Sequence, residues 1–315
     1  GKLDYTPGVS NRAVFYSKPQ DARMLVHGDD RVLLADEDAA NAMLKLLQSQ
    51  YTVKEVARIG NGFKPQEAVI LNRIVRYVPI AVDGNPAMEL EADHRHVQLL
   101  IEDLVGFGKV GVKPVDAPRV RHSEDEVWTG YDSPKLDRRG VTRYRSNTMR
   151  LSYLGQDRID LQESTKALAQ KMADPNEFDL TQLKRVARYL KRYPRAVLVY
   201  PQQSMPRTVD GWVDSDHAGD IITRKSTSGL CGMFGKHLLK SSSTVQDPIG
   251  LSSGEAEYYA AVKGGSFLLG FRSLLEDFGI TIRLNLIVKT DSSAAKGMLS
   301  RRGLGKQRHI STRYL

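Results

Sequence analysis

Cysteine is almost absent from this sequence, because Cys231 is the only one among its 315 residues. A single cysteine excludes internal disulfides, zinc sites built from CxxC pairs and the disulfide-stapled scaffolds of small secreted proteins. Runs of 18 apolar residues are also missing, and the N-terminal Gly1-Lys2-Leu3-Asp4 begins no apolar signal segment. We therefore expect no membrane span, no secretory signal, and an intracellular protein of the cytoplasm or the nucleus.

Strong compositional bias is absent as well. Hydrophobic residues make up 41% and charged residues 26% of the chain, which excludes disordered, collagenous and fibrous proteins. The length of 315 residues suits about two domains. Acidic residues are fewer than basic ones, 37 against 46, and the net charge of +9 suits a polyanionic partner such as nucleic acid, although many basic proteins bind none.

Basic residues gather in two stretches that contain no acid. One stretch lies on a predicted amphipathic helix at 179–193, whose apolar stripe includes Leu183, Val186 and Leu190. The other covers the last residues of the sequence. The bases of each stretch either contact phosphates or form a solvated face. The two sets are Lys184, Arg185, Arg188, Lys191, Arg192 and Arg195, and Lys296, Arg301, Arg302, Lys306, Arg308 and Arg313.

The N-terminal region predicts a β-hairpin with two acids at its tip. Residues 24–26 and 32–34 are apolar, and the turn-like segment between them contains Asp29 and Asp30. Such a pair can hold a metal ion between an enzyme and a nucleoside triphosphate, and it is also common in solvated turns. A helix capped by Asp36 should follow, then strands near 68–71 and 74–80 and a helix near 97–104.

The middle of the chain changes in composition. Residues 106–142 are rich in glycine, proline and charge, which predicts a linker with little regular structure. Helices are expected again at 145–154, 161–172 and 179–193.

The C-terminal third predicts strands and helices in a new order. Strand patterns occur at 209–213, 229–234 and 237–241, followed by a long helix at 253–278 that a capping box from Ser252 to Glu255 opens. A strand at 284–289 and a helix at 294–299 complete the pattern. The order β-β-β-α-β-α predicts a mixed α/β layer architecture.

Three acids of this region lie at the ends of predicted elements. Asp214 follows the first strand, Glu257 lies in the second turn of the long helix, and Asp291 follows the fourth strand. Adjacent strand ends lie about 5 Å apart, and a helix packed across the sheet can bring its first turns over them. The carboxylates would then share a divalent cation, Mg²⁺ or Mn²⁺ rather than zinc. Equally, Asp214 and Asp291 can be ordinary turn residues, and Glu257 an acid favoured by the helix dipole.

Four motifs follow one another through this third of the chain. They are Gly211-Trp-Val-Asp-Ser-Asp-His-Ala-Gly-Asp220, Arg224-Lys-Ser-Thr-Ser-Gly229, Leu251-Ser-Ser-Gly-Glu-Ala-Glu-Tyr258 and Thr290-Asp-Ser-Ser293. Their order and spacing resemble the ribonuclease H domain of copia-type retrotransposon Pol proteins. Upstream, 144–146, 157–160 and 183–191 are similar to the family's connecting region. Residues 24–30 resemble the palm hairpin of its reverse transcriptase, with His27-Gly28 in place of the usual Tyr-Val.

The resemblance implies a fold for each part of the chain. Residues 205–315 would form an α/β, ribonuclease H-like mixed sheet with flanking helices, truncated before its last strand and helix. An α+β region would precede it, with a partial reverse-transcriptase palm/thumb at 1–105, the linker at 106–142 and a helical connection region at 143–200.

The resemblance also implies an activity. The full-length parent would carry out RNA-directed DNA synthesis, and the ribonuclease H domain would hydrolyse the RNA strand of RNA/DNA hybrids with two Mg²⁺ or Mn²⁺ ions per active site. The partners would be RNA/DNA hybrid, template–primer nucleic acid and other parts of the Pol polyprotein, with no membrane.

Residue roles follow from the family's motifs. Asp214, Glu257 and Asp291 would be the catalytic metal ligands of the nuclease, with Glu255 as the alternative helix acid. Asp29 and Asp30 would be the catalytic metal ligands of the polymerase. The implied phosphate contacts are Lys184, Arg188, Lys191, Arg192, Arg224, Lys225, Arg301, Arg302, Lys306 and Arg308.

One alternative function stays open. The chain lacks the upstream polymerase Asp and the fourth ribonuclease H carboxylate that the family has, and Ser311 stands where the family often has Asp. A decayed or domesticated copy would keep the fold and the basic surface, and would act only as a nucleic-acid-binding module.

Overall fold

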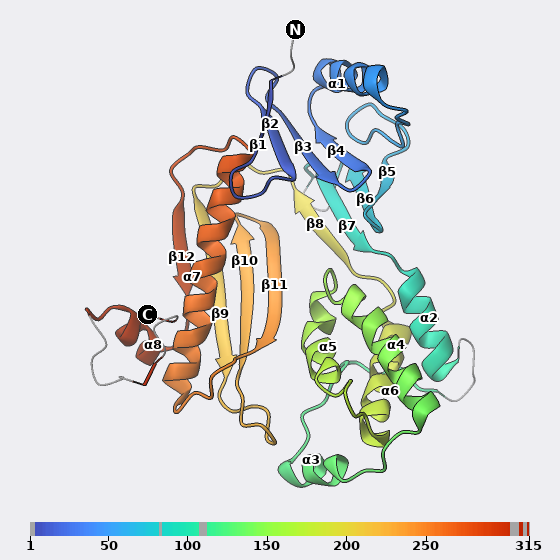
Figure 1. The fold of residues 1–315 in the computed structure, drawn as a ribbon, viewed down its shortest axis with the longest axis vertical. Helices are drawn as coiled ribbons and strands as arrows, with labels where there is room; N and C mark the ends of the chain where they lie inside the picture. The colour runs from blue at the N-terminus through green and yellow to red at the C-terminus, as the bar shows by residue number, and fades with distance from the viewer. Residues whose placement is uncertain (1–3, 82–83, 107–111, 303–308, 311–313, 315) are drawn as a thin grey trace.

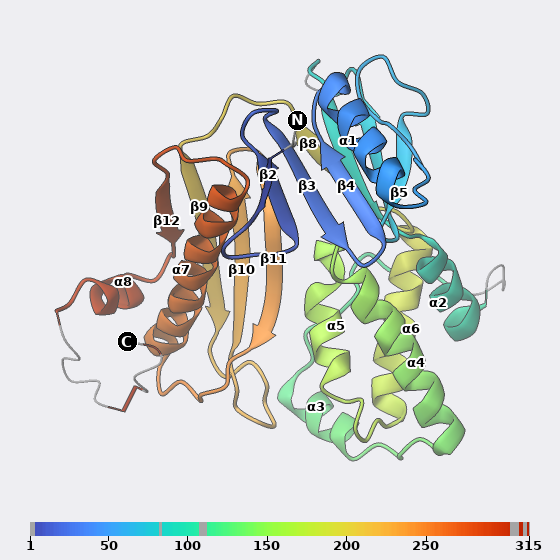
Figure 2. The same cartoon turned by 45° about the horizontal axis from the view of Figure 1, so that its top comes forward.

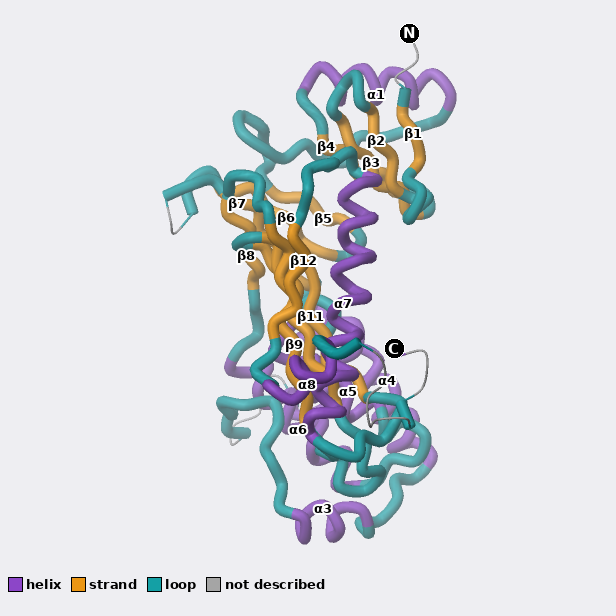
Figure 3. Tube along the Cα trace, turned by 90° about the vertical axis from the view of Figure 1, so that its left-hand side faces the viewer, coloured by secondary structure: helices purple, strands orange, loops and turns teal. Residues whose placement is uncertain are grey.

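The computed structural model describes residues 4–81, 84–106, 112–302, 309–310 and 314. Over these ranges the chain forms three four-stranded sheets and a group of helices, so the predicted α/β architecture is confirmed in outline (Figure 1). Figure 3 shows from the side that α1 and α3 lie at opposite ends of the molecule.

The first sheet contains the predicted hairpin. Its antiparallel strands β1 (Tyr5–Pro7), β2 (Val14–Ser17), β3 (Ala22–His27) and β4 (Asp30–Leu34) follow one another in space as in sequence. The hairpin of β3 and β4 is confirmed, whereas β1 and β2 were not predicted. Helix α1 (Glu37–Gln50) follows, and the Asp36 side chain accepts the Ala39 N–H at 2.8 Å, as its cap.

The second sheet encloses a helical insertion. Its antiparallel strands are β5 (Glu67–Ile70), β6 (Arg73–Val78), β7 (Ala87–Ala92) and β8 (Val197–Pro201). Between β7 and β8 the chain forms α2 (Arg95–Val105), α3 (Glu124–Tyr131), α4 (Arg138–Leu154), the 3₁₀ turn η1 (Ile159–Leu161), α5 (Gln162–Ala169) and α6 (Glu177–Arg192). The apolar stripe predicted on α6 packs against α2 and α4 through the fully buried Leu100, Leu151 and Leu183.

The prediction of little regular structure at 106–142 is wrong in its second half. Helix α3 begins at a complete capping box, in which Ser123 accepts the Glu126 N–H and Glu126 accepts the Ser123 N–H. Helix α4 begins seven residues earlier than the predicted helix at 145, because Asp137 caps it by accepting the Gly140 N–H at 2.6 Å. These local caps outweigh the glycine and proline content of the segment.

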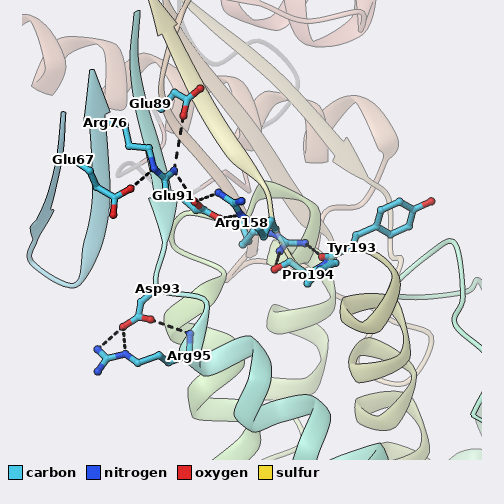
Figure 4. A network of polar contacts seen from close by, with 10 residues as sticks. Glu67, Arg76, Glu89, Glu91, Asp93, Arg95, Arg158, Tyr193 and Pro194 are labelled. Atoms are coloured by element: carbon cyan, nitrogen blue, oxygen red, sulfur yellow. Dashed lines mark hydrogen bonds and ion pairs between the residues drawn. The ribbon is translucent and has the colours of Figure 1, made fainter. Parts of the chain in front are cut away.

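A buried carboxylate ties the second sheet to the helices (Figure 4). Glu91 of β7 is 2% exposed, and it accepts hydrogen bonds from Arg76 of β6 at 2.7 Å and from Arg195, beyond α6, at 2.6 and 2.7 Å. The hydrogen bond from Arg195 lowers the pKa of Glu91, and Arg76 adds to this effect against the cost of burial. Nearby, Arg158 donates to the carbonyl oxygens of Tyr193 and Pro194 at 3.0 and 3.3 Å.

The third sheet is mixed and lies in the C-terminal part. Its spatial order is β11 (His237–Val245), β10 (Thr227–Phe234), β9 (Thr208–Asp216), β12 (Asn285–Lys289), and only β12 runs parallel to its neighbour β9. Helix α7 (Ser253–Asp277) covers one face, and α8 (Ser293–Leu299) follows β12 (Figure 1). The predicted element order is confirmed, with one correction: β9 continues to Asp216, so Asp214 lies within the strand.

Helix α7 approaches this sheet closely because glycines face it. A Cβ atom on Gly264 would lie 2.5 Å from Cγ1 of Val213, and a Cβ on Gly232 of β10 would meet the Phe267 ring. Both positions therefore require glycine, and the missing side chains let the first turns of α7 lie beside the strand that carries Asp214.

The far end of α7 holds the first sheet (Figure 2). Asp277 accepts backbone N–H groups of Val9 at 2.7 Å and of Asn11 at 2.9 Å, from the loop between β1 and β2. Arg23 of β3 donates to the Phe278 carbonyl oxygen at 2.9 Å. Among the residues that the structure describes, no helix is both long enough and apolar enough to cross a bilayer.

Candidate metal centre

Three carboxylates meet at one end of the third sheet. Asp214 comes from β9, Glu257 from the second turn of α7, and Asp291 from the residues that join β12 to α8. Each offers an oxygen atom, and these oxygens all lie within 4.8 Å of one another. Within the described ranges this is the only group of three or more acidic, histidine or cysteine side chains placed to share an ion.

Glu257 is the buried member of this group. It is 8% exposed, and its Oε1 accepts the Ser215 N–H at 2.9 Å and the Ser215 hydroxyl at 3.0 Å, while Oε2 lies 3.5 Å from the Thr290 hydroxyl. Burial raises the pKa of Glu257, and the charges of Asp214 and Asp291 raise it further, against the hydrogen bonds from Ser215. Burial and the neighbouring acids thus destabilise the ionised form of Glu257, while the hydrogen bonds from Ser215 stabilise it.

The donor set fits a hard divalent cation. Three carboxylates without nitrogen or sulfur ligands are typical of Mg²⁺ and Mn²⁺ sites. Asp214 and Asp291 are exposed, so water can complete the coordination of an ion there. A cation would also relieve the repulsion that raises the pKa of Glu257.

Asp214 and Asp291 open into a cleft of about 590 Å³ whose lining includes no residue of α7. Ile159 and Gln162, from η1 and α5, form its other wall, and Gln162 donates to the Ser241 carbonyl oxygen at 3.2 Å. Trp212 lines the cleft and is 53% exposed, with Nζ of Lys289 4.3 Å from its ring centroid. Ser215 and Lys289 were not predicted as site residues, although each is one or two residues from a predicted ligand.

Glu255, the alternative helix acid, lies apart from this group. Its carboxylate accepts hydrogen bonds from the Tyr259 hydroxyl at 2.6 Å, His309 Nε2 at 3.0 Å and the Leu251 N–H at 3.1 Å. Burial would raise the pKa of Glu255, but the hydrogen bonds from Tyr259 and His309 lower it overall. Ser252 caps α7 as predicted, while Glu255 bonds Leu251 in place of the Ser252 N–H that a capping box requires.

The two acids of the N-terminal hairpin are not gathered with others. Asp29 lies in the turn, and Asp30 is the first residue of β4 and pairs with His27. Both are exposed, and no third acid joins them in the described part of the chain. The structure therefore shows a solvated hairpin tip at this position.

The predicted phosphate contacts do not form one surface. Those on α6 lie on the side of the third sheet away from α8, which Arg301 and Arg302 follow (Figure 1). Arg188 already donates to the Lys113 carbonyl oxygen at 2.7 Å, and Arg192 pairs with Asp116 at 3.0 Å.

The remaining predicted contacts are placed as follows. Arg224 is exposed and Lys225 half-buried in the turn between β9 and β10, and Lys184 and Lys191 are half-buried on α6. Lys306 and Arg308 lie outside the described residues.

Fold and site together define a mixed α/β protein with a carboxylate centre that could hold a metal ion. No protein-family model matches the chain. The retrovirus-related Pol polyprotein from transposon RE1 of Arabidopsis thaliana is 29% identical over 196 residues, which cover 62% of this chain and 13% of that polyprotein. The corresponding polyprotein from transposon RE2 of the same plant is 30% identical over 183 residues, 58% of this chain and 12% of the polyprotein.

A shorter relative covers more of the sequence. An uncharacterized mitochondrial protein of Arabidopsis thaliana is 25% identical over 239 residues, 75% of this chain and 89% of that protein.

The similarity to the transposon polyproteins makes the chain a homologue of retrovirus-related Pol polyproteins from copia-type transposons, and the predicted resemblance is confirmed. The chain matches only about an eighth of the length of the RE1 and RE2 polyproteins.

Proposed function

We propose that the chain is a fragment of a retrotransposon reverse transcriptase/ribonuclease H, and that residues 205–315 hydrolyse the RNA strand of RNA/DNA hybrids. The observation that carries this proposal is the convergence of Asp214, Glu257 and Asp291 within 4.8 Å. The similarity to Pol polyproteins supports it, because nucleic acid is the expected substrate of such proteins. We also propose that the part before residue 106 derives from the palm/thumb of the reverse transcriptase, and that the helices from α3 to α6 form the helical connection.

The three carboxylates would hold the divalent ions. Two such ions, when bound, activate a water molecule and stabilise the leaving oxygen of a phosphodiester. The chain itself supplies placement: Ser215 fixes the Glu257 carboxylate with two hydrogen bonds, and Gly264 lets α7 approach β9. The cleft beside Asp214 and Asp291 gives the substrate backbone access to both exposed ligands.

Cleavage of a labelled RNA strand in an RNA/DNA hybrid with Mg²⁺ tests the proposal. Asp214→Asn should abolish cleavage, because it removes a ligand charge from the centre. Asp216→Asn is the matched control: it lies two residues further along β9, outside the group of three, and an amide oxygen can still accept the Thr227 N–H. Cleavage that survives Asp214→Asn would contradict the nuclease assignment.

The same assay addresses the alternative function. If the chain is only a binding module, the unsubstituted chain should bind the hybrid without cleaving its RNA strand. The Asp214→Asn variant should then keep the same affinity for the hybrid. The net charge of +9 favours binding of this kind, with an affinity that falls as salt rises.

RNA-directed DNA synthesis is proposed for the full-length parent alone. Asp29 and Asp30 are its candidate metal ligands, and the exposed hairpin tip leaves them accessible to further ligands.

A further inference from the structure

The buried Glu255 connects the start of α7 with residues near the end of the sequence. It is 2% exposed, and among the described residues its hydrogen bonds come from Tyr259, His309 and Leu251. A carboxylate removed from water is stable only when donors surround it. His309, which is 54 positions away in sequence, supplies one of these donors.

Other residues near the end of the sequence contact the same two turns of α7. The Tyr258 hydroxyl donates to the Tyr314 carbonyl oxygen at 2.6 Å, and the rings of Tyr259 and Tyr314 lie 4.7 Å apart between centroids. Ile310 is 7% exposed and packs in the same apolar cluster as both α7 tyrosines. We call Glu255, His309, Ile310 and Tyr314 the C-terminal clamp.

The clamp also contacts α8. Ala295, which is fully buried, belongs to the cluster that holds Ile310 and the two tyrosines. A Cβ atom on Gly254 would lie 2.8 Å from the Cβ of Ala294, so the first turns of the two helices touch. Helix α8 begins two residues after Asp291, with Ser292 as its cap.

The clamp therefore lies beside the contact between α7 and α8, the two helices whose separation sets the distance between Glu257 and Asp291. Glu257 is on the clamped turns of α7, and Asp291 leads into α8. Two carboxylates with oxygens within 4.8 Å repel each other when both are ionised, so the docking of α7 against α8 opposes that repulsion. The hydrogen-bond partners of Glu255 are Leu251, Tyr259 and His309 and none of the three ligands, so its effect on their positions is transmitted by the backbone of α7.

We propose that Glu255 and His309 are positioning residues, which fix the separation of Glu257 and Asp291 and thereby raise the affinity of the centre for divalent cations. The proposal rests on the metal site of the proposed function. It assigns no ligand role to Glu255, whose oxygens are already occupied.

Titration of the metal-free chain with Mn²⁺, followed by electron paramagnetic resonance, tests this proposal without cleavage. His309→Ala should weaken Mn²⁺ binding about 10-fold, the lower end of the effect of removing residues that orient metal ligands. The number of ions bound at saturation should stay the same, because the ligands remain. His309→Gln should recover most of the affinity, since its amide N–H can still donate to Glu255.

Two further variants separate positioning from other effects. Asp277→Asn loosens the opposite end of the same helix and controls for a general loss of stability, so it should leave Mn²⁺ affinity unchanged. Glu257→Gln removes a ligand and should lower the number of ions bound. The clamp is refuted if His309→Ala binds Mn²⁺ as tightly as the parent, or no more weakly than Asp277→Asn. A parent chain that binds no better than Glu257→Gln would instead overturn the proposed function, and the clamp with it.

Discussion

Two glutamates of this molecule are almost equally removed from solvent and have opposite neighbours. Glu91 of the second sheet is 2% exposed between Arg76 and Arg195, and Glu257 of α7 is 8% exposed between Asp214 and Asp291. The pKa of Glu91 is lowered, chiefly by the hydrogen bond from Arg195, and that of Glu257 is raised, chiefly by burial. The first carboxylate finds its countercharge within the chain, whereas the neighbours of the second are two further acids, which together with it could hold a metal ion.

The largest expected effect comes from breaking the ion pairs of Glu91 with Arg76 and Arg195. Glu91→Gln should lower the free energy of unfolding by about 3 kcal/mol, because it leaves two guanidinium groups without their shared partner. Glu89→Gln on the same strand is the control, and its contact with Arg76 is longer, at 3.9 Å. It should change stability by less than about 0.5 kcal/mol. Urea unfolding of both variants gives the comparison, and equal effects would contradict it.

The next effect concerns how closely α7 approaches the Glu257 site. Gly264→Ala should destabilise the chain by about 1–2 kcal/mol, because the new methyl group meets Val213. Gly270→Ala on the same helix has open space around its Cβ and should stabilise by about 0.5–1 kcal/mol. Thermal unfolding should therefore shift in opposite directions. Shifts of the same sign would show that glycine does not set the helix–sheet distance.

A smaller effect comes from removing the charge of Glu257. In metal-free buffer at pH 7, Glu257→Gln should raise the free energy of unfolding by less than about 1 kcal/mol, since it relieves repulsion in the centre. Added Mg²⁺ should then raise the melting temperature of the unsubstituted chain by more than that of the variant. Calorimetry with and without Mg²⁺ measures both. An equal response to Mg²⁺ would place the ion elsewhere.

The smallest effect is the opposite pH dependence of the two glutamates. The pKa of Glu257 is raised above its usual 4.5, so its ionisation costs stability as pH rises through and above that value. The pKa of Glu91 is lowered, so its stabilisation is present above 4.5 and is lost as pH falls below it. The Glu91→Gln deficit should therefore shrink between pH 7 and pH 3, and the Glu257→Gln gain should vanish near pH 4. Parallel profiles would contradict the opposite shifts.

Local sequence signals were sufficient for most elements of the last third. The element order of the third sheet, the Ser252 cap and the two ends of α7 agree with the structure, because periodicity and capping act within a few residues. Strands β1 and β2, which were not predicted, are short and carry polar residues. The loop between them is held by Asp277, which lies 268 positions away from Val9 in sequence. No local pattern could show such a contact.

The candidate site divides in the same way. Strand and helix order were enough to bring Asp214, Glu257 and Asp291 together, since topology determines which element ends meet. A third metal ligand for Asp29 and Asp30 would have to come from an element distant in sequence. The spacing of residues within the hairpin therefore could not predict whether the pair has one. The occupied carboxylate of Glu255 and the paired guanidinium groups on α6 likewise depend on partners far away in sequence.

The contact of Asp277 with residues 9–11 also constrains the order of events during synthesis. The loop between β1 and β2 is synthesised before α7, and the Asp277 acceptor follows Val9 by 268 positions. At roughly 5–20 residues per second, the loop waits about 13–54 s before that acceptor exists. The contact between this loop and α7 can therefore form only after that interval, which makes the docking of the first sheet onto α7 a late step for the nascent chain.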